Sequence, residues 1–146
     1  MKKSKKFSDV LHILLHMAGA KEPTTSEMLA KAAQTNSVVV RRTMAGLRDR
    51  GFVHSEKGHG GGWTLSCDLN KTTLYDVYEA IGSPTILALG NRSESSNCLV
   101  EHAVITATRN AFDEAESLLT GRFQSTTLAD LYRIIKKHPH GHSKEK

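Results

Sequence analysis

The sequence predicts a mainly α fold with a small β-wing: a winged helix-turn-helix domain followed by a long dimerisation helix. Three helical patterns come first, and two strand-like segments joined by a glycine-rich turn over residues 57–62 follow them. Positive charge is concentrated in this part, since residues 1–62 contain 11 lysines and arginines against 5 acidic residues, whereas residues 63–146 contain 9 against 10. A long helical pattern then covers residues 98–120.

The length of 146 residues fits one folded domain with an appended element. We divide the chain into a winged helix-turn-helix domain (1–82), a loop (83–97), a dimerisation helix with a C-terminal helix (98–137) and a disordered tail (138–146). No apolar run approaches the roughly 18 residues that span a bilayer, and no signal-peptide cleavage site follows the basic start. We therefore expect a cytoplasmic protein without membrane contact.

The helix-turn-helix is predicted from apolar spacing and end signals. A first helix over residues 7–17 stops at Gly19. Thr24 and Glu27 fit a capping box for a second helix, with Met28 on its apolar side. A third helix is expected over residues 38–50, with Asn36 or Ser37 as its cap and Gly51 as a left-handed end.

The remaining elements are shorter except for one helix. Residues 52–55 and 63–66 are strand-like, and a helix is expected over residues 74–81. The long helix should be capped by Asn97 and stopped by Gly121, and a final helix over residues 128–137 should have Thr127 as its cap. Residues 90–97 have the composition of a flexible loop.

The long helix carries a stripe of small and apolar residues at near-heptad spacing: Val100, Val104, Ala107, Ala111 and Leu118. A helix of this length is not needed to complete a small winged helix. We therefore expect it to pair with a second copy of the chain. The alternative is that the stripe packs within its own chain.

The third helix of such a fold lies in the major groove of double-stranded DNA, with its N-terminal residues nearest the bases. The candidate contacts are Ser37, Val38, Val39, Arg41 and Arg42. Arginine can bind guanine through two hydrogen bonds, and valine can contact a thymine methyl. The alternative for either arginine is a contact to phosphate alone.

Two further segments are candidate DNA contacts. Ser26, at the start of the second helix, could bind phosphate through exposed backbone amides. In the wing, Lys57, His59 and Gly60 suit the backbone or a narrow minor groove. The glycine-rich turn is no nucleotide-binding loop, because it lacks a GKS/T ending and no helix follows it.

The residues just described resemble the Rrf-two family of bacterial transcription regulators. The matching motifs are Arg41-Arg42, residues 47–53 (LRDRGFV), residues 58–65 (GHGGGWTL), residues 73–81 (TLYDVYEAI) and residues 127–131 (TLADL). The resemblance covers nearly the whole chain. It implies a homodimeric winged-helix factor, usually a repressor, whose long helix crosses between subunits.

Well-known members of this family bind an iron–sulfur cluster through three cysteines near the start of the long helix. This chain keeps Cys98 at such a position, while Arg92 stands where a first ligand is expected and Val104 or Thr106 where a third is expected. One thiolate per subunit cannot supply the usual ligands. We therefore expect no cluster and no other cofactor.

Cys98 has a second interpretation. A helix N-terminus favours the reactive thiolate, so Cys98 is a candidate thiol sensor that responds to a redox or small-molecule signal. The alternative is an inert small residue. The other cysteine, Cys67, follows the second strand and is expected to be structural.

Metal sites and catalysis are not predicted. The two cysteines show no zinc-finger spacing. His138, His140 and His142 have metal-binding spacing but lack cysteine or carboxylate partners, which favours a solvated tail. With no nucleophile and base in a supporting motif, the sequence predicts a sequence-specific DNA-binding regulator, a homodimeric repressor, and not an enzyme. The rival is a winged helix that binds another protein instead of DNA.

Overall fold

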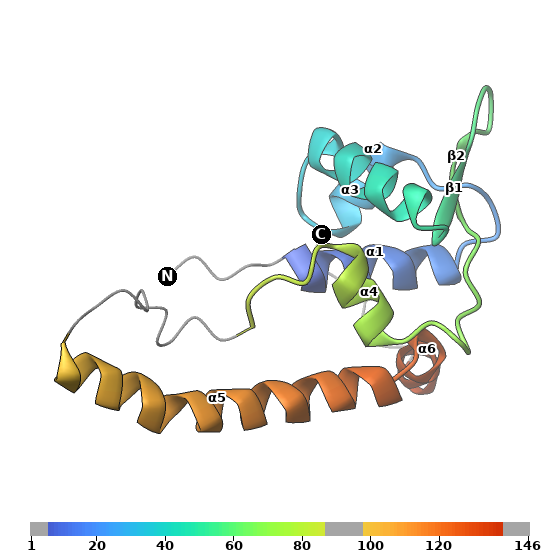
Figure 1. Ribbon diagram of the computed structural model, residues 1–146. Coiled ribbons are helices and arrows are strands. Elements are labelled where there is room, and N and C mark those ends of the chain that lie inside the picture. The colour runs from blue at the N-terminus through green and yellow to red at the C-terminus, as the bar shows by residue number, and fades with distance from the viewer. Residues whose placement is uncertain (1–5, 87–97, 139–146) are drawn as a thin grey trace.

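The computed structural model describes residues 6–86 and 98–138. Helices α1 (Lys6–Ala18), α2 (Ser26–Ala32) and α3 (Ser37–Asp49) pack together, and the antiparallel strands β1 (Val53–Glu56) and β2 (Gly62–Leu65) project from them as a wing (Figure 1). Below α1 lies α4 (Leu74–Ala80), while α5 (Leu99–Ser125) extends away and α6 (Leu128–Lys137) returns to the body. This arrangement confirms the predicted mainly α fold with a small β-wing.

The start of α2 differs from the sequence prediction. The cap is Thr25, whose side chain accepts a hydrogen bond from the backbone N–H of Met28, and Glu27 closes no capping box. Thr24 instead pairs with the wing, as described below. The side chain of Met28 is 60% exposed, so the core side of α2 is formed by Leu29, Ala30 and Ala33 without it.

Both ends of α3 are closed by local hydrogen bonds. The side chain of Asn36 accepts from the N–H of Val39 at 3.0 Å, which confirms one of the two expected caps. At the other end Gly51 has a φ of +81°, as expected. The N–H of Phe52 then donates to the carbonyl of Leu47, and that of Gly51 to the carbonyl of Arg48, so the last turn ends in a Schellman motif.

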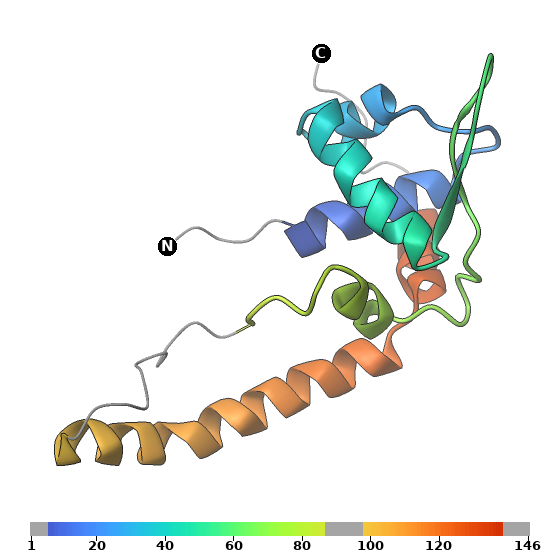
Figure 2. The ribbon, with the colours of Figure 1, turned by 45° about the horizontal axis from the view of Figure 1, so that its top comes forward.

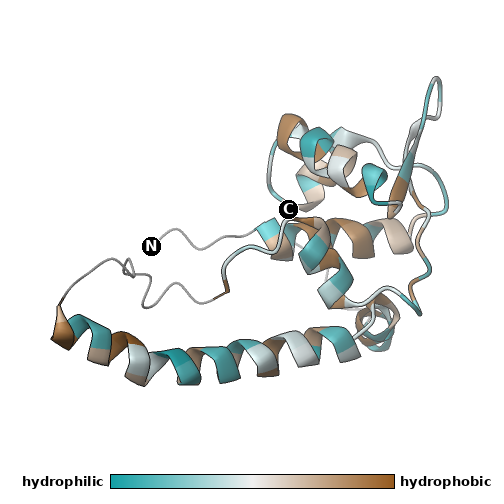
Figure 3. Cartoon of the chain, viewed as in Figure 1, coloured by the Kyte–Doolittle hydropathy of each residue, from teal (hydrophilic) through white to brown (hydrophobic). Residues whose placement is uncertain are grey.

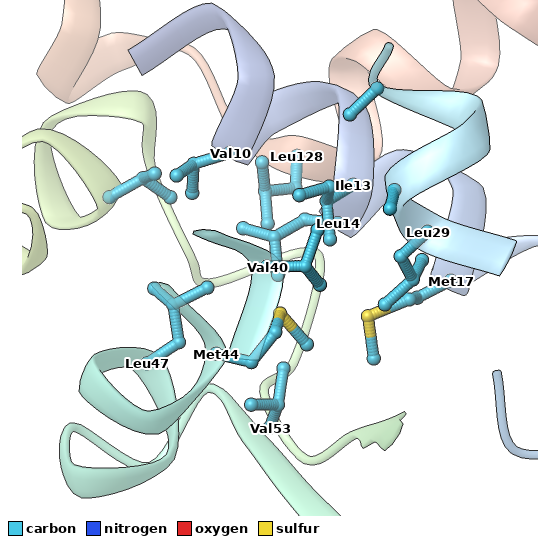
Figure 4. Packing of buried hydrophobic residues seen from close by; sticks show 13 residues of the cluster. Val10, Ile13, Leu14, Met17, Leu29, Val40, Met44, Leu47, Val53 and Leu128 are labelled. Carbon is cyan, nitrogen blue, oxygen red and sulfur yellow. The ribbon is translucent and has the colours of Figure 1, made fainter. Parts of the chain in front are cut away.

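The core contains side chains from every helix except α5. Figure 4 shows it close up, with residues of α1 and α3 facing one another and Leu128 of α6 among them. The buried apolar residues are Val10, Ile13, Leu14, Met17, Leu29, Ala30, Ala33, Val40, Met44, Leu47, Val53, Val77 and Leu128. The sequence grouped α6 with the dimerisation helix, but its first residue belongs to the winged-helix core.

Matching caps join the starts of α4 and α6. Thr73 with Asp76, and Thr127 with Asp130, each form a complete capping box. Thr73 and Thr127 also face each other in an antiparallel bridge, because the N–H of Leu74 donates to the carbonyl of Thr126. These bonds place α6 beside α4 and direct Leu128 into the core.

Near its C-terminal end, the long helix α5 packs against α1 and α4 through Phe123. The ring centroid of Phe123 lies 5.2 Å from that of Phe7 in α1 and 6.2 Å from that of Tyr78 in α4. The helix also passes through Gly121, so the predicted stop was wrong. A mid-helix glycine costs only about 1 kcal/mol relative to alanine, and the aromatic contacts of Phe123 hold the turn that follows.

None of the 27 residues of α5 is buried. Its predicted stripe of Val100, Val104, Ala107, Ala111 and Leu118 is exposed along its whole length. Figure 3 shows apolar residues at the far end of α5, where the helix stands away from the body. The inward side carries half-buried residues such as Phe112 and Phe123, so the stripe is not used by the chain's own core.

Three predictions concern residues beyond those described: the flexible loop over 90–97, the cap Asn97, and the tail after His138. Among the described residues, Cys98 occupies the cap position of α5. No helix in residues 6–86 and 98–138 combines the length and the apolar character needed to cross a membrane.

We expect Leu128→Ala to lower the free energy of unfolding by about 2–5 kcal/mol, because it leaves a cavity in a core where Leu128 is 0% exposed. Ile134→Ala is the matched control, since Ile134 lies on the same helix but is 57% exposed. Urea unfolding at a fixed protein concentration measures both. Equal effects of the two substitutions would contradict this role of Leu128.

Candidate nucleic-acid interface

The first turns of α3 carry apolar side chains that the core does not use. Val40, Met44 and Leu47 face the core, and Val38 and Val39 are 61% and 47% exposed. Their apolar surfaces are therefore accessible to a partner. Ser37 opens the same helix and is half-buried. The predicted contact residues of α3 therefore lie at one accessible helix end.

The two predicted reader arginines differ in their surroundings. Arg41 forms an ion pair with Glu27 of α2, with Nη2 and Oε1 2.5 Å apart. Among the described residues, no carboxylate lies within ion-pair distance of Arg42. Both side chains are exposed. Arg41 is thus held toward α2, whereas Arg42 is paired with no carboxylate of the described residues.

The wing is attached to the helix-turn-helix by Trp63. The N–H of Thr24 donates to the carbonyl of Trp63 at 2.9 Å, and the N–H of Trp63 donates to the carbonyl of Thr24 at 2.8 Å. The indole N–H of Trp63 also donates to the hydroxyl of Ser26 at 3.0 Å. A Cβ on Gly62 would come within 2.8 Å of the Thr24 backbone, so this close approach requires glycine.

The wing tip is a tight turn built on glycine. The N–H of Gly61 donates to the carbonyl of Gly58 at 3.0 Å, and a Cβ on Gly61 would lie 2.4 Å from the carbonyl oxygen of Glu56. Lys57, His59 and Gly60 are all exposed around this turn. The three predicted wing contacts therefore share one projecting end, where the backbone can approach a ligand closely.

Figure 2 relates the wing to the helices. In this view and in Figure 1, α3 and the wing lie on the side of the body opposite to α5. The exposed cations Arg41, Arg42 and Lys57 come from these elements. These exposed cations thus belong to a helix and a projecting hairpin on the same side of the body. A helix end beside such a hairpin is the arrangement that reads a major groove and an adjacent backbone or minor groove.

Ser26 occupies a different position from the one the sequence suggested. Its side chain is 8% exposed, and its hydroxyl accepts from the indole of Trp63. This hydroxyl does not face solvent, and any phosphate contact here is left to the backbone amides. Sequence reasoning also missed the pairing of Glu27 with Arg41, because a pair fourteen residues apart leaves no local spacing signal.

The thiols of this chain do not fit an iron–sulfur cluster of the usual kind. Clusters are held mainly by cysteine thiolates, and the chain has only two cysteines. Cys67 is half-buried after β2, whereas Cys98 is exposed at the start of α5. Burial raises the pKa of the Cys67 thiol, and a hydrogen bond with Thr72 opposes that shift. The two sulfurs lie on separate elements in different environments.

Comparison with known proteins finds relatives that are described as transcriptional regulators. The family model described as Rrf2, Iron-dependent Transcriptional regulator, matches residues 3–134. An HTH-type transcriptional regulator of Aquifex aeolicus (strain VF5) is 29% identical over 119 residues, covering 77% of each chain.

Solved structures show the same fold. T. potens IscR superposes with a TM-score of 0.69 at 18% identity, covering 100% of this chain and 94% of that one. CymR, described as the global cysteine regulator of B. subtilis, gives 0.69 at 22% identity, covering 92% and 98%. With the family model matching nearly the whole chain and the winged helix in place, this protein belongs to the Rrf2 family of transcriptional regulators and is not an enzyme.

Proposed function

We propose that this regulator is a homodimeric repressor that binds a two-fold symmetric DNA operator. The observation that carries the proposal is that α3 and the wing lie on the same side of the body and that Val38, Val39, Arg42 and Lys57 on these elements are exposed. An α3 from each subunit would enter successive major grooves, about 34 Å apart along the duplex. Repression would follow if the bound dimer excluded the transcription machinery from a promoter.

The different surroundings of Arg41 and Arg42 support the proposal that this protein recognises a base sequence. Arg42, without an ion pair among the described residues, can bind a base edge or a phosphate at little cost. Arg41 must first leave Glu27 or bind DNA while keeping that contact. We therefore assign the larger share of base recognition to Arg42, with Val38 and Val39 placed to contact thymine methyl groups.

Dimer formation is supported by the exposed stripe of α5. Val104 and Leu118 are 57% and 67% exposed, and an apolar stripe of this length is unusual on the surface of a monomer. Its small residues, Ala107 and Ala111, would let two helices approach closely. A second copy of α5 is the occupant proposed for this stripe.

We further propose that the regulator works without an iron–sulfur cluster and that Cys98 is the site of signal input. Cys98 is exposed at the cap of the proposed dimerisation helix. Oxidation or another covalent change of the thiol there would alter the start of α5 and the geometry of the dimer. The spacing of the two recognition helices, and with it operator affinity, would change in turn.

A winged helix that binds another protein is the second candidate function, and the exposed Met28, Val38 and Val39 favour it. The dependence of binding on salt distinguishes these two functions. Affinity for DNA falls steeply with added salt because protein binding releases the cations that are condensed on the DNA, whereas an apolar contact with a protein shows no such dependence. Salt-titrated binding therefore decides between them.

Arg42→Ala should weaken binding to a specific site by roughly 5- to 150-fold, the effect of losing about 1–3 kcal/mol, and should relax base preference. Lys57→Ala should weaken specific and random DNA alike and lower the salt slope by about one. Both are measured by salt-titrated binding to the region upstream of the protein's own gene and to a random fragment.

Arg122→Ala is the control for these variants, because it removes the same charge from α5, away from α3 and the wing. It should bind the upstream fragment like the wild type. If the wild type shows no preference for any upstream fragment over random DNA, the protein-binding function takes precedence.

Val104→Glu should raise the dimer dissociation constant at least about tenfold, because a desolvated and unpaired carboxylate costs several kcal/mol. Thr106→Glu adds the same charge two residues later, on another side of the helix, and should leave the dimer intact. Analytical ultracentrifugation over a concentration series distinguishes them. A monomeric wild type would rule out this interface.

Peroxide treatment should weaken operator binding of the wild type at least about fivefold and leave Cys98→Ser unaffected. Cys67→Ser should respond like the wild type, because burial raises the pKa of the Cys67 thiol and keeps it in the less reactive protonated form. The readout is the operator dissociation constant before and after oxidation. Equal sensitivity of wild type and Cys98→Ser would remove Cys98 as the sensor.

A further inference from the structure

A cavity of about 400 Å³ lies between α1, α3 and the end of α4. Its inner wall consists of apolar side chains that also belong to the core, Val10 and Ile13 of α1 with Val40 and Leu47 of α3 (Figure 4). Ile81, at the end of α4, lines it as well. Small-molecule sites have volumes of roughly 300–1,000 Å³ and mostly apolar walls. The size and the apolar lining of this cavity therefore fit a small organic ligand.

Polar and charged side chains complete the lining. Lys6 and Asp9 come from the first turn of α1, Thr35 precedes α3, and Arg42 and Thr43 belong to α3. The cavity thus has two positive charges against one negative charge. In the described part of the chain, none of these three charged side chains forms an ion pair. The uncompensated positive charge favours a ligand that carries one negative charge.

A glycine inside α3 is a second and independent indication of a ligand. Gly46 lies within the helix, where glycine is less favourable than alanine. A Cβ at this position would meet no atom of the described residues within 4 Å, so the packing of the chain does not require glycine. Gly46 lines the cavity, and its missing side chain leaves the helix backbone accessible there. An occupant that approaches α3 closely accounts for this glycine.

The cavity shares a residue with the proposed DNA interface. Arg42 lines the cavity and is exposed on α3, and Val39 beside it is 47% exposed and lines the cavity too. A guanidinium can bind a carboxylate through two parallel hydrogen bonds. These are the same donors that would bind a base or a phosphate of DNA. A carboxylate in the cavity and a DNA operator would therefore compete for Arg42.

We propose that this cavity binds a small carboxylate with an apolar body, and that the bound ligand lowers operator affinity by engaging Arg42. The carboxylate pairs with Lys6 and Arg42, and the apolar body packs against Ile13 and Leu47. The effect on the operator rests on the proposed DNA binding, whereas occupation of the cavity does not. This input is separate from the one proposed at Cys98.

Methyl NMR spectroscopy of the full chain without DNA tests the cavity. The probes are phenylacetate and hexanoate, each compared with its uncharged amide. Both acids should shift the methyl resonances of Ile13 and Ile81, but not that of Ile135, which lies in a groove between α1 and α6. The amides should bind at least about tenfold more weakly, because they lose a charge-assisted hydrogen bond. If neither acid shifts the cavity methyls, or if the amides bind equally well, the proposed ligand class is wrong.

Substitutions at two helical glycines locate the ligand. Gly46→Leu places a side chain in the cavity and should weaken phenylacetate binding at least about tenfold, because overpacking of a filled site is costly. Leucine is the better helix former, so the urea midpoint should not fall. Gly121→Leu is the matched control, since a Cβ there also meets no described atom within 4 Å but the glycine lies in α5. Equal affinity of the wild type and Gly46→Leu would overturn the site.

Asp9→Asn tests the charge of the cavity in the opposite direction. It removes the negative charge of the lining and should tighten phenylacetate binding. Weaker binding by this variant would contradict an anionic ligand.

Operator affinity with and without phenylacetate tests the regulatory effect. A saturating concentration should weaken operator binding of the wild type by roughly 5- to 150-fold, as expected for the loss of one arginine contact. Operator binding of Arg42→Ala and of Gly46→Leu should not respond. If phenylacetate fills the cavity and operator affinity stays the same, the regulatory effect is wrong. If the wild type prefers no upstream fragment over random DNA, the proposed function fails and the regulatory effect with it, while the NMR titration still decides whether the cavity binds carboxylates.

Discussion

The position of the wing depends on the contact between Trp63 and the start of α2. Two backbone hydrogen bonds join Trp63 to Thr24, and the indole reaches the hydroxyl of Ser26. A two-stranded hairpin is only marginally stable on its own, so these bonds decide where its tip points. Because α2 also contacts α3, the same attachment sets the wing relative to the recognition helix. The glycine at position 62 allows the two backbones to meet.

The helix-turn-helix separates its functions between two faces of α3. One face, with Val40, Met44 and Leu47, packs into the core and fixes the helix axis. The other presents Val38, Val39 and Arg42 to solvent, while Arg41 is held by Glu27. An exposed ion pair of this kind contributes little to stability. Its consequence is directional, because it orients one arginine and leaves the neighbouring one available.

The long helix α5 is attached to the winged-helix body at its C-terminal end. It is anchored at its C-terminal end by Phe123 against Phe7 and Tyr78, and α6 then returns Leu128 to the core. No residue of α5 is buried by its own chain, although one side of it is apolar. The proposed dimer and the proposed input at Cys98 are argued from this feature. In that proposal, a helix fixed at one end and paired with its neighbour along its length would transmit a change at its other end.

The sequence by itself determined the order and type of the elements, because apolar periodicity, caps and glycine stops are local signals. Thus Asn36, Gly51 and the capping position of Thr127 were predicted correctly, as were the winged fold and its family. Tertiary structure decided what depends on distant contacts. It placed Thr24 on the wing and not at the α2 cap, gave the hydroxyl of Ser26 to Trp63, joined Arg41 to Glu27, and carried α5 through Gly121. The three pairings join residues far apart in the chain, and the continuation of α5 overrides the weak local preference of Gly121 for a helix end. No spacing in the sequence could therefore reveal these features.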